Sequence, residues 1–257
     1  MLGKLLKYEF KATGRMLLPL YGAMILAGLV SSFVINRDAF GATQVIFTMV
    51  YVGICVAALV ITLLLVIQRF NKNLLSDEGY LMFTLPVSTD SLIFSKLIVA
   101  VCWGIIGTIA GILSGIALFA TIIPWGDIPE MIRFIVTHMD AVDWKDWLML
   151  VEVLVSCILD YALFVMVVYT SLSVGQLPFA GKHRKAASLG AFFLIYIIYT
   201  ILISVTGGSL STADPDTWIF SLSVVAQMGL AILVEVVLIA VMFFITRFIL
   251  NRHLNLE

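Results

Sequence analysis

The chain has 257 residues, of which 62% are hydrophobic and only 12% are charged, and its formal net charge is -1. A soluble domain of this length usually has about 45–50% apolar and about 25% charged residues. The composition therefore excludes a soluble enzyme, a disordered protein and a nucleic-acid-binding protein, and it leaves an integral membrane protein. We expect an all-α fold, because lipid cannot satisfy the polar groups of an open backbone and the apolar runs are far longer than barrel strands.

Residues 1–15 form the first predicted element, an amphipathic helix. At 100° per residue its basic side chains gather on one face and its apolar side chains on the opposite face. Such a helix lies in the membrane interface, with its basic side toward anionic headgroups. Two compatible roles stay open: an anchor for the first span, or an elbow helix that also contacts a cytoplasmic partner.

Six segments are predicted to cross the membrane, since a span needs roughly 20 predominantly apolar residues. They make up a single transmembrane domain over residues 16–250, and they are 16–35, 45–67, 97–123, 148–172, 187–206 and about 219–245. Of the 15 lysines and arginines, all but Arg37, Arg133 and Lys145 fall on one side of these spans. Because basic residues favour the cytoplasmic side, both termini and the connections 68–96 and 173–186 are expected to face the cytoplasm.

Small residues mark the third span. Gly107, Gly111 and Gly115 follow one another at intervals of four, a spacing that lets helices approach closely in lipid. Packing within the subunit and contact with a second copy both remain open. Three cysteines, Cys55, Cys102 and Cys157, lie in apolar runs without metal-ligand spacing, and we interpret them as small core residues.

A further helix is predicted between the third and fourth spans. Asp127 and Glu130 have the spacing of a capping box, and apolar residues follow at helical intervals. This pattern predicts a second interfacial helix, on the outer face of the membrane.

Three carboxylates fall inside the predicted spans: Glu152, Asp160 and Glu235. An ionised acid at the bilayer centre costs at least about 2.5–3.5 kcal/mol, so each one needs a physical reason. Asp160 and Glu235 lie near mid-span, with no lysine or arginine at that depth. Either they are protonated and hydrogen-bonded to Gln227, Tyr161 or neighbouring serines or threonines, or they line a substrate pathway that would favour a cationic substrate.

The sequence contains no motif of an intramembrane enzyme. HExxH and GxSxG are both missing, and the glycines of segment 175–182 have the wrong spacing for a phosphate-binding loop. We therefore expect this chain to be no enzyme and to bind neither a metal nor a cofactor of its own.

The cytoplasmic connection 68–96 is the most informative segment. It contains Glu78-Gly79, a short stretch ending at Leu85-Pro86-Val87-Ser88, and Lys96 at the foot of the third span. This arrangement resembles the segment after the second span in ABC-2 type permeases, the membrane subunits of many bacterial ABC exporters. Residues 5–11 also resemble the N-terminal elbow helix of that family. The pattern departs from the family at Leu85, where threonine is usual, and at Tyr80 and Met82, where the family has more polar residues.

The resemblance implies a permease subunit of an exporter in the bacterial cytoplasmic membrane. ATP and Mg²⁺ would bind to a separate ATPase subunit, present in two copies, and a second permease copy, identical or paralogous, would complete the pathway. Pro86 is expected to end a short coupling helix, and Ser88 to cap the helix that follows. The residues expected to couple to the ATPase are Asp77, Glu78, Gly79, Tyr80, Leu81, Phe83, Leu85, Pro86 and Ser88.

Other interpretations stay open. Segment 68–96 could be an ordinary loop resting on the bilayer. The chain could instead be a self-sufficient secondary carrier or channel that uses Asp160 and Glu235 as proton or cation sites, although the missing internal repeat speaks against this. A non-transporting assembly factor is a further alternative. The possible substrate pathway comprises Asp160, Glu235, Glu152 and Gln227.

Overall fold

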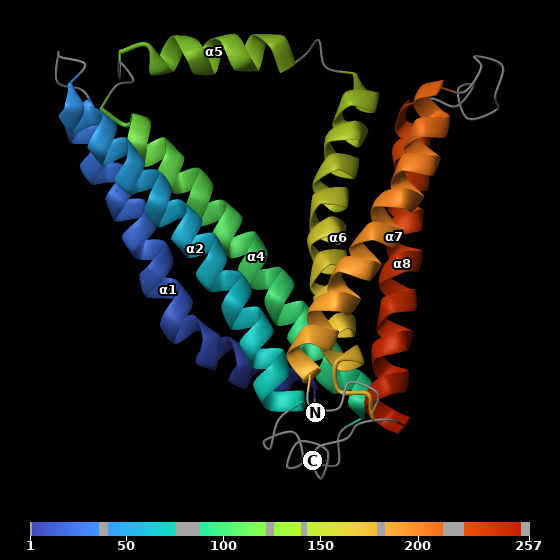
Figure 1. Cartoon of the computed structure of the whole chain (residues 1–257). Coiled ribbons are helices and arrows are strands. Elements are labelled where there is room, and N and C mark those ends of the chain that lie inside the picture. The colour runs from blue at the N-terminus through green and yellow to red at the C-terminus, as the bar shows by residue number, and fades with distance from the viewer. Residues whose placement is uncertain are drawn as a thin grey trace. The chain divides into compact units, whose positions relative to one another are not determined.

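The computed structural model describes residues 2–35, 41–75, 88–121, 126–139, 143–178, 183–212 and 224–252. Within these ranges the regular structure is helical and contains no strand (Figure 1). The helices are α1 (Leu2–Ile35), α2 (Ala42–Leu74), α4 (Thr89–Phe119), α5 (Ile128–Met139), α6 (Trp144–Val174), α7 (Arg184–Thr212) and α8 (Val224–Arg252). The all-α prediction is therefore confirmed for the described part of the chain.

Six of these helices are long and apolar enough to cross a membrane, namely α1, α2, α4, α6, α7 and α8. The 31 residues of α4 extend over about 46 Å at 1.5 Å per residue, which exceeds the roughly 30 Å of the hydrocarbon core. Its ends therefore reach the headgroups or the water beyond them. Within the described ranges the six predicted spans are confirmed in number and order, and the chain is a multi-pass membrane protein.

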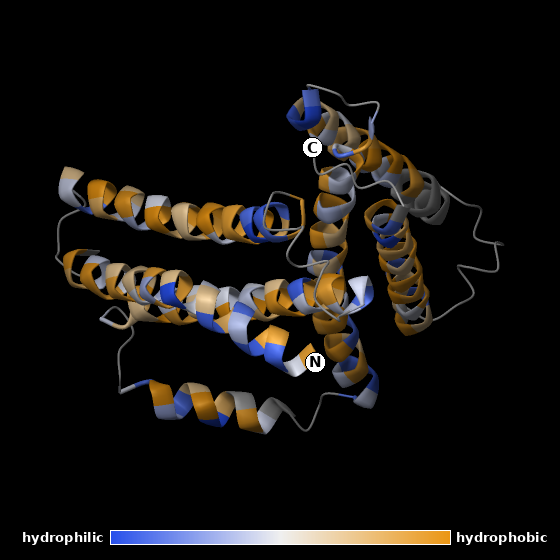
Figure 2. Ribbon diagram, turned by 90° about the horizontal axis from the view of Figure 1, so that it is seen from below, coloured by the Kyte–Doolittle hydropathy of each residue, from blue (hydrophilic) through white to orange (hydrophobic). Residues whose placement is uncertain are grey.

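Apolar residues predominate along the long helices (Figure 2). Many of their side chains are exposed. On α2, for example, Ile46, Met49 and Leu59 are each more than half exposed. Such a surface would drive aggregation in water, whereas lipid solvates it as well as a protein core does. Hydropathy therefore identifies these helices as spans but does not tell which of their faces is buried.

The long helices differ from the predicted spans at their ends. The third span, expected to end at residue 123, ends at Phe119 as α4. The reason is a contact with another helix, because Thr121 turns back to Ser32 of α1. The N–H of Thr121 donates to Oγ of Ser32 over 3.1 Å, and its Oγ1 donates to the Ser32 carbonyl over 2.7 Å. These bonds take the place of helical ones. The sixth span was expected from about residue 219, but α8 begins at Val224, and residues 213–223 lie outside the described ranges.

The two predicted interfacial helices have different outcomes. The amphipathic segment 1–15 is not a separate element, because α1 continues through it into the first span without a break, with Pro19 inside the helix. The helix expected after Asp127 is present as α5, and its first turn closes with a 2.9 Å bond from the Met131 N–H to the Asp127 carbonyl. That either segment lies in the membrane interface stays a prediction.

The chain forms two compact units, which we describe separately. One consists of Met1–Leu2, Ile67–Ala100 and Trp144–Glu257, and the other of Gly3–Val66 and Val101–Asp143. In the second unit a buried hydrogen-bond network joins three helices. Nε1 of Trp103 on α4 donates to Oγ1 of Thr13 on α1 over 2.7 Å. The hydroxyl of Tyr21 on α1 donates to the Trp103 carbonyl over 3.2 Å and lies 3.1 Å from Oγ1 of Thr62 on α2.

The same unit contains a close helix contact that depends on glycine. A Cβ atom at Gly28 of α1 would lie only 2.5 Å from the Ser114 carbonyl oxygen of α4. Oγ of Ser114 in turn donates to the Met24 carbonyl over 2.9 Å. Small residues therefore bring α1 and α4 together, as expected for helices packed in lipid.

The interpretation of the cysteines as core residues is wrong for Cys157, which is exposed on α6, while Cys55 and Cys102 are half-buried. An apolar run predicts burial only where the surroundings are water. In a membrane the outward faces of a span are equally apolar, so a cysteine there can face lipid.

Candidate functional site

The predicted coupling segment lies mostly outside the described residues. Asp77, Glu78, Gly79, Tyr80, Leu81, Phe83, Leu85 and Pro86 all fall in residues 76–87, and the expected short helix there is not described. Ser88 is described, and it lies at the N-terminal cap of α4. Its Oγ is 3.4 Å from the Ser91 backbone nitrogen, which donates to it, and 2.9 Å from Oγ of Ser91. The expectation that Ser88 caps the following helix is confirmed.

Three contacts connect the first two turns of α4 with the last turns of α8. Oγ1 of Thr89 donates to Oδ1 of Asn251 over 2.7 Å. Nε of Arg247 lies 2.9 Å from Oδ1 of Asp90, and both side chains are partly exposed. We call these residues, together with the Phe94–Phe243 ring pair, whose centroids are 4.6 Å apart, the α4–α8 clamp.

The end of α2, which precedes the coupling segment, is packed against α6. The rings of Phe70 and Tyr169 stack with centroids 3.9 Å apart and an interplanar angle of 10°. Phe70 and Leu74 are fully buried, and Tyr169 nearly so. The helix end that leads into the segment is therefore fixed by apolar packing. The helix start that follows it combines polar contacts at Thr89 and Asp90 with the buried side chains of Leu92 and Ile93.

Helices α6 and α8 lie side by side in this unit, and buried threonines join their C-terminal halves. Oγ1 of Thr170 and Oγ1 of Thr246 are 2.9 Å apart, and both side chains are almost completely buried. Hydroxyl pairs of this kind are typical of polar contacts between spans. Because Thr246 directly precedes Arg247 in the chain, this pair joins α6 to the part of α8 that belongs to the α4–α8 clamp.

The predicted pathway carboxylates gather on the same helices. Oγ of Ser156 on α6 donates to Oε1 of Glu235 on α8 over 2.8 Å. Asp160 is exposed on α6 and interacts electrostatically with Glu235 and with Tyr199 of α7. Asp160 and Glu235 are therefore brought together, as a shared pathway requires, and the predicted serine partner is found for Glu235.

The remaining two pathway residues lie nearer the N-terminal ends of the same two helices. Oε1 of Glu152 faces Gly229 of α8, where a Cβ atom would lie 3.8 Å away. Gln227 is half-buried on α8. Oε2 of Glu152 and Oε2 of Glu235 are both buried and have no hydrogen-bond partner among the described residues. Those two oxygens can accept a proton or a donor group.

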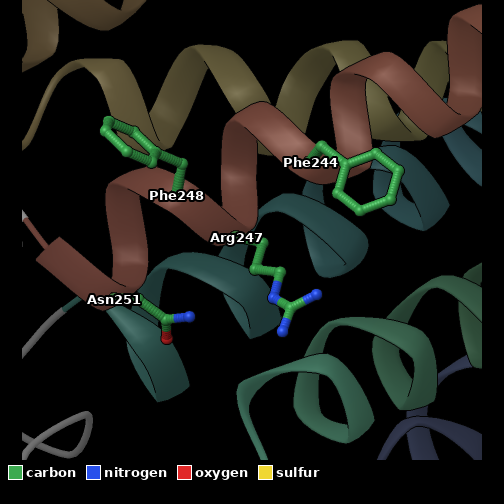
Figure 3. Close-up of a pocket in the computed structure, with 4 residues that line it drawn as sticks. All are labelled: Phe244, Arg247, Phe248 and Asn251. Carbon is green, nitrogen blue, oxygen red and sulfur yellow. The ribbon is translucent and has the colours of Figure 1, made fainter.

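A cavity of about 350 Å³ lies beside the end of α8, lined by Phe244, Arg247, Phe248 and Asn251 (Figure 3). All four side chains project from this one helix, and the two polar ones also belong to the α4–α8 clamp. Arg247 already pairs with Asp90, and Oδ1 of Asn251 already accepts a bond from Thr89. We therefore interpret the cavity as the open side of the clamp rather than as a separate ligand site.

The glycines of the third span are divided between two environments. A Cβ atom at Gly107 would lie 2.9 Å from the Tyr21 hydroxyl, so Gly107 packs against α1 within the subunit. At Gly111 and Gly115 nothing lies within 4 Å of such an atom. Contact with a second copy through those two glycines stays a prediction.

Sequence reasoning missed the residues of the α4–α8 clamp. One signal was present: Asp90 is an acidic residue at the foot of a span on the side where nearly all the lysines and arginines gather, so a basic partner was to be expected. The sequence could not choose Arg247 among the basic candidates. Tyr199 and Ser156 were also missed as individual residues.

Other chemistry is sparse in the part of the chain that the structure describes, where no group of three or more His, Cys, Asp or Glu side chains could hold a metal ion. Comparison of the chain with models of known protein families gives no match, and searches of curated proteins and of solved structures give no match either.

Proposed function

We propose that this chain is the permease subunit of an ABC exporter in the bacterial cytoplasmic membrane, with both termini in the cytoplasm. A separate ATPase subunit, present in two copies, binds ATP and Mg²⁺ and hydrolyses the nucleotide. Two permease copies, identical or paralogous, enclose the substrate pathway. This chain itself catalyses no reaction.

The observation that carries the proposal is the segment from Glu78 to Ser88 and its direct continuation into α4. The segment resembles the coupling region of ABC-2 type permeases, and α4 begins at Thr89 with Ser88 as its cap. A capped helix of 31 residues is stiff along its axis, so a displacement applied at its foot is carried across the membrane. Six apolar helices of sufficient length also agree with a permease.

The proposed mechanism is a two-state switch. ATP brings the two ATPase subunits together, and this motion shifts segment 77–88 of each permease. The spans then change between an inward-facing and an outward-facing state, because nucleotide favours one of the two. Asp77 and Glu78 offer charge to the ATPase surface, Tyr80, Leu81 and Phe83 offer apolar contacts, and Pro86 ends the contact region.

The test uses the ATP-binding-cassette protein encoded by the neighbouring reading frame, if one is present, co-expressed with the full chain. We expect the two to purify together in detergent, and Glu78→Lys to weaken the association. Glu130→Lys, the same charge reversal on α5 outside the coupling segment, is the matched control. Association and ATP hydrolysis that are unchanged in Glu78→Lys contradict the coupling role, and a genome without such a protein contradicts the proposal.

A second candidate function is supported by the carboxylates of α6 and α8. Glu235 bonds Ser156, Asp160 lies within electrostatic range, and one buried oxygen of Glu235 has no partner among the described residues. These groups suit a proton or cation site of a self-sufficient secondary carrier. When a pH gradient is imposed, with the acidic side outside, the purified chain in proteoliposomes would then let the lumen acidify without any ATPase, read with a trapped pH-sensitive dye. Proton flux that requires the ATPase contradicts this candidate.

A further inference from the structure

We infer that the α4–α8 clamp couples segment 77–88 to the carboxylates of α6 and α8, and that Asp90 and Arg247 are its positioning residues. The inference rests on the proposed function and adds to it the route by which movement leaves the coupling segment. It assigns to these two residues a role that the family resemblance does not give them.

The position of the clamp is the first argument. Thr89 and Asp90 are the first two residues of α4, directly after Ser88, so every displacement of the segment reaches them first. Their partners, Asn251 and Arg247, lie one turn apart on α8. Phe94 and Phe243 continue the same antiparallel register another turn or two into each helix. Three successive contacts therefore hold the foot of α4 to the end of α8.

The route beyond the clamp is the second argument. Thr246 neighbours Arg247 in the chain and pairs with Thr170 of α6. From Thr246 to Glu235 is eleven residues along α8, or about 17 Å of continuous helix. A shift of the end of α8 thus reaches Glu235 along α8 itself. It reaches Ser156 on α6 through the buried Thr170–Thr246 pair.

The character of the contacts is the third argument. Phe70 and Tyr169 fix the end of α2 by stacked, buried rings, which no small change of charge can release. The α4–α8 clamp instead includes an ion pair whose side chains are 44% and 35% exposed, although Oδ1 of Asp90 itself is buried. It also includes an exposed hydrogen bond, and it lies beside a cavity of about 350 Å³. Exposed polar pairs add little stability and exchange readily with water. Leu92 and Ile93 stay buried in the same turns of α4, so the polar contacts of the clamp are the part of this helix end that a change of charge can alter.

The test is a charge-swap cycle in the complete complex, reconstituted in lipid nanodiscs with its co-purifying ATPase. The variants are Asp90→Arg, Arg247→Asp and the double variant that carries both, with Asp90→Asn as a conservative variant that keeps the fold. Two quantities are measured: association with the ATPase, and the stimulation of ATP hydrolysis by the permease. Lys145→Asp, a charge reversal of an exposed cation near the other end of α6, is the control.

We expect each single reversal to keep the association and to lower the stimulation by at least about fivefold, the lower range of coupling between sites. The double variant is expected to restore most of the stimulation of ATP hydrolysis, and Lys145→Asp to leave that stimulation unchanged. A purely structural role would lower association and yield together, without rescue by the swap. Stimulation that is unchanged in both single reversals overturns the inference and leaves the proposed function intact. A wild-type chain that assembles with no ATPase overturns both.

Discussion

Oγ of Ser156 donates a 2.8 Å hydrogen bond to Oε1 of Glu235, and this bond joins α6 to α8 at membrane depth. The second carboxylate oxygen of Glu235, Oε2, is buried without a partner among the described residues. Asp160 is close enough to interact electrostatically with Glu235. One oxygen of the carboxyl group thus accepts a hydrogen bond, and the other has no partner among the described residues. We therefore treat Glu235, rather than the exposed Asp160, as the centre of the predicted pathway.

Replacement of both mid-span carboxylates tests this pathway. The double variant Asp160→Asn/Glu235→Gln is expected to lower efflux of a cationic dye from intact cells by about tenfold, the effect of losing one ionic contact of about 1.4 kcal/mol. Assembly, measured by size-exclusion chromatography, stays unchanged, because Gln can still accept the bond from Ser156. The control is Asp127→Asn/Glu130→Gln, which removes two carboxylates beside and within α5. Dye efflux equal to that of the wild type would remove the pathway from the account.

The Trp103–Thr13 bond is expected to stabilise the packing of α1 on α4. Trp103→Phe keeps an aromatic ring near Phe10 and Tyr21, but it removes the donor to Thr13. We expect a loss of about 1–2 kcal/mol, because one buried hydrogen bond and part of a ring are lost. Thermal unfolding in detergent measures it, and Trp147→Phe, at a residue that is 46% exposed, is the control. Equal midpoints for the two variants would show that the bond adds nothing.

The contact of Gly28 with Ser114 makes a sharp prediction about small residues. Gly28→Ala places a Cβ atom 2.5 Å from a backbone oxygen, so α1 and α4 must separate, at a cost of about 1–3 kcal/mol. Gly22→Ala is the matched control on the same helix, since nothing lies within 4 Å of its Cβ position. There the change should be neutral or stabilising, because alanine favours helix over glycine by about 0.5–1 kcal/mol. A midpoint for Gly28→Ala at or above that of Gly22→Ala contradicts the packing.

The sequence predicts the spans well because the hydropathy of neighbouring residues adds up along each segment. Roughly 20 apolar residues in a row have few alternatives to a membrane helix, so the number and order of the spans follow from composition along the chain. The need of Glu235 for a nearby hydroxyl also follows from its depth, because an unpaired acid there is costly. Ser88 as a helix cap is likewise local information.

What the sequence could not predict depends on which helix faces meet. The early end of α4 comes from Ser32, 89 residues away from Thr121 along the chain. Cys157 faces outward because lipid and protein core are equally apolar, so hydropathy does not separate them. The choice of Arg247 for Asp90, and of Ser156 for Glu235, likewise requires the register between helices, which no single segment contains.

The central claim is that segment 77–88 receives a separate ATPase, and site-specific photocrosslinking measures this most directly. A photoreactive amino acid replaces Leu81 in the full chain, and native membranes are irradiated with and without ATP and vanadate. We predict a covalent product with an ATP-binding-cassette protein, identified by mass spectrometry, in an amount that changes with nucleotide. The same photoreactive group at Met131 on α5 should give no such product. Crosslinks from position 81 only to lipid or to the chain's own helices would contradict the account.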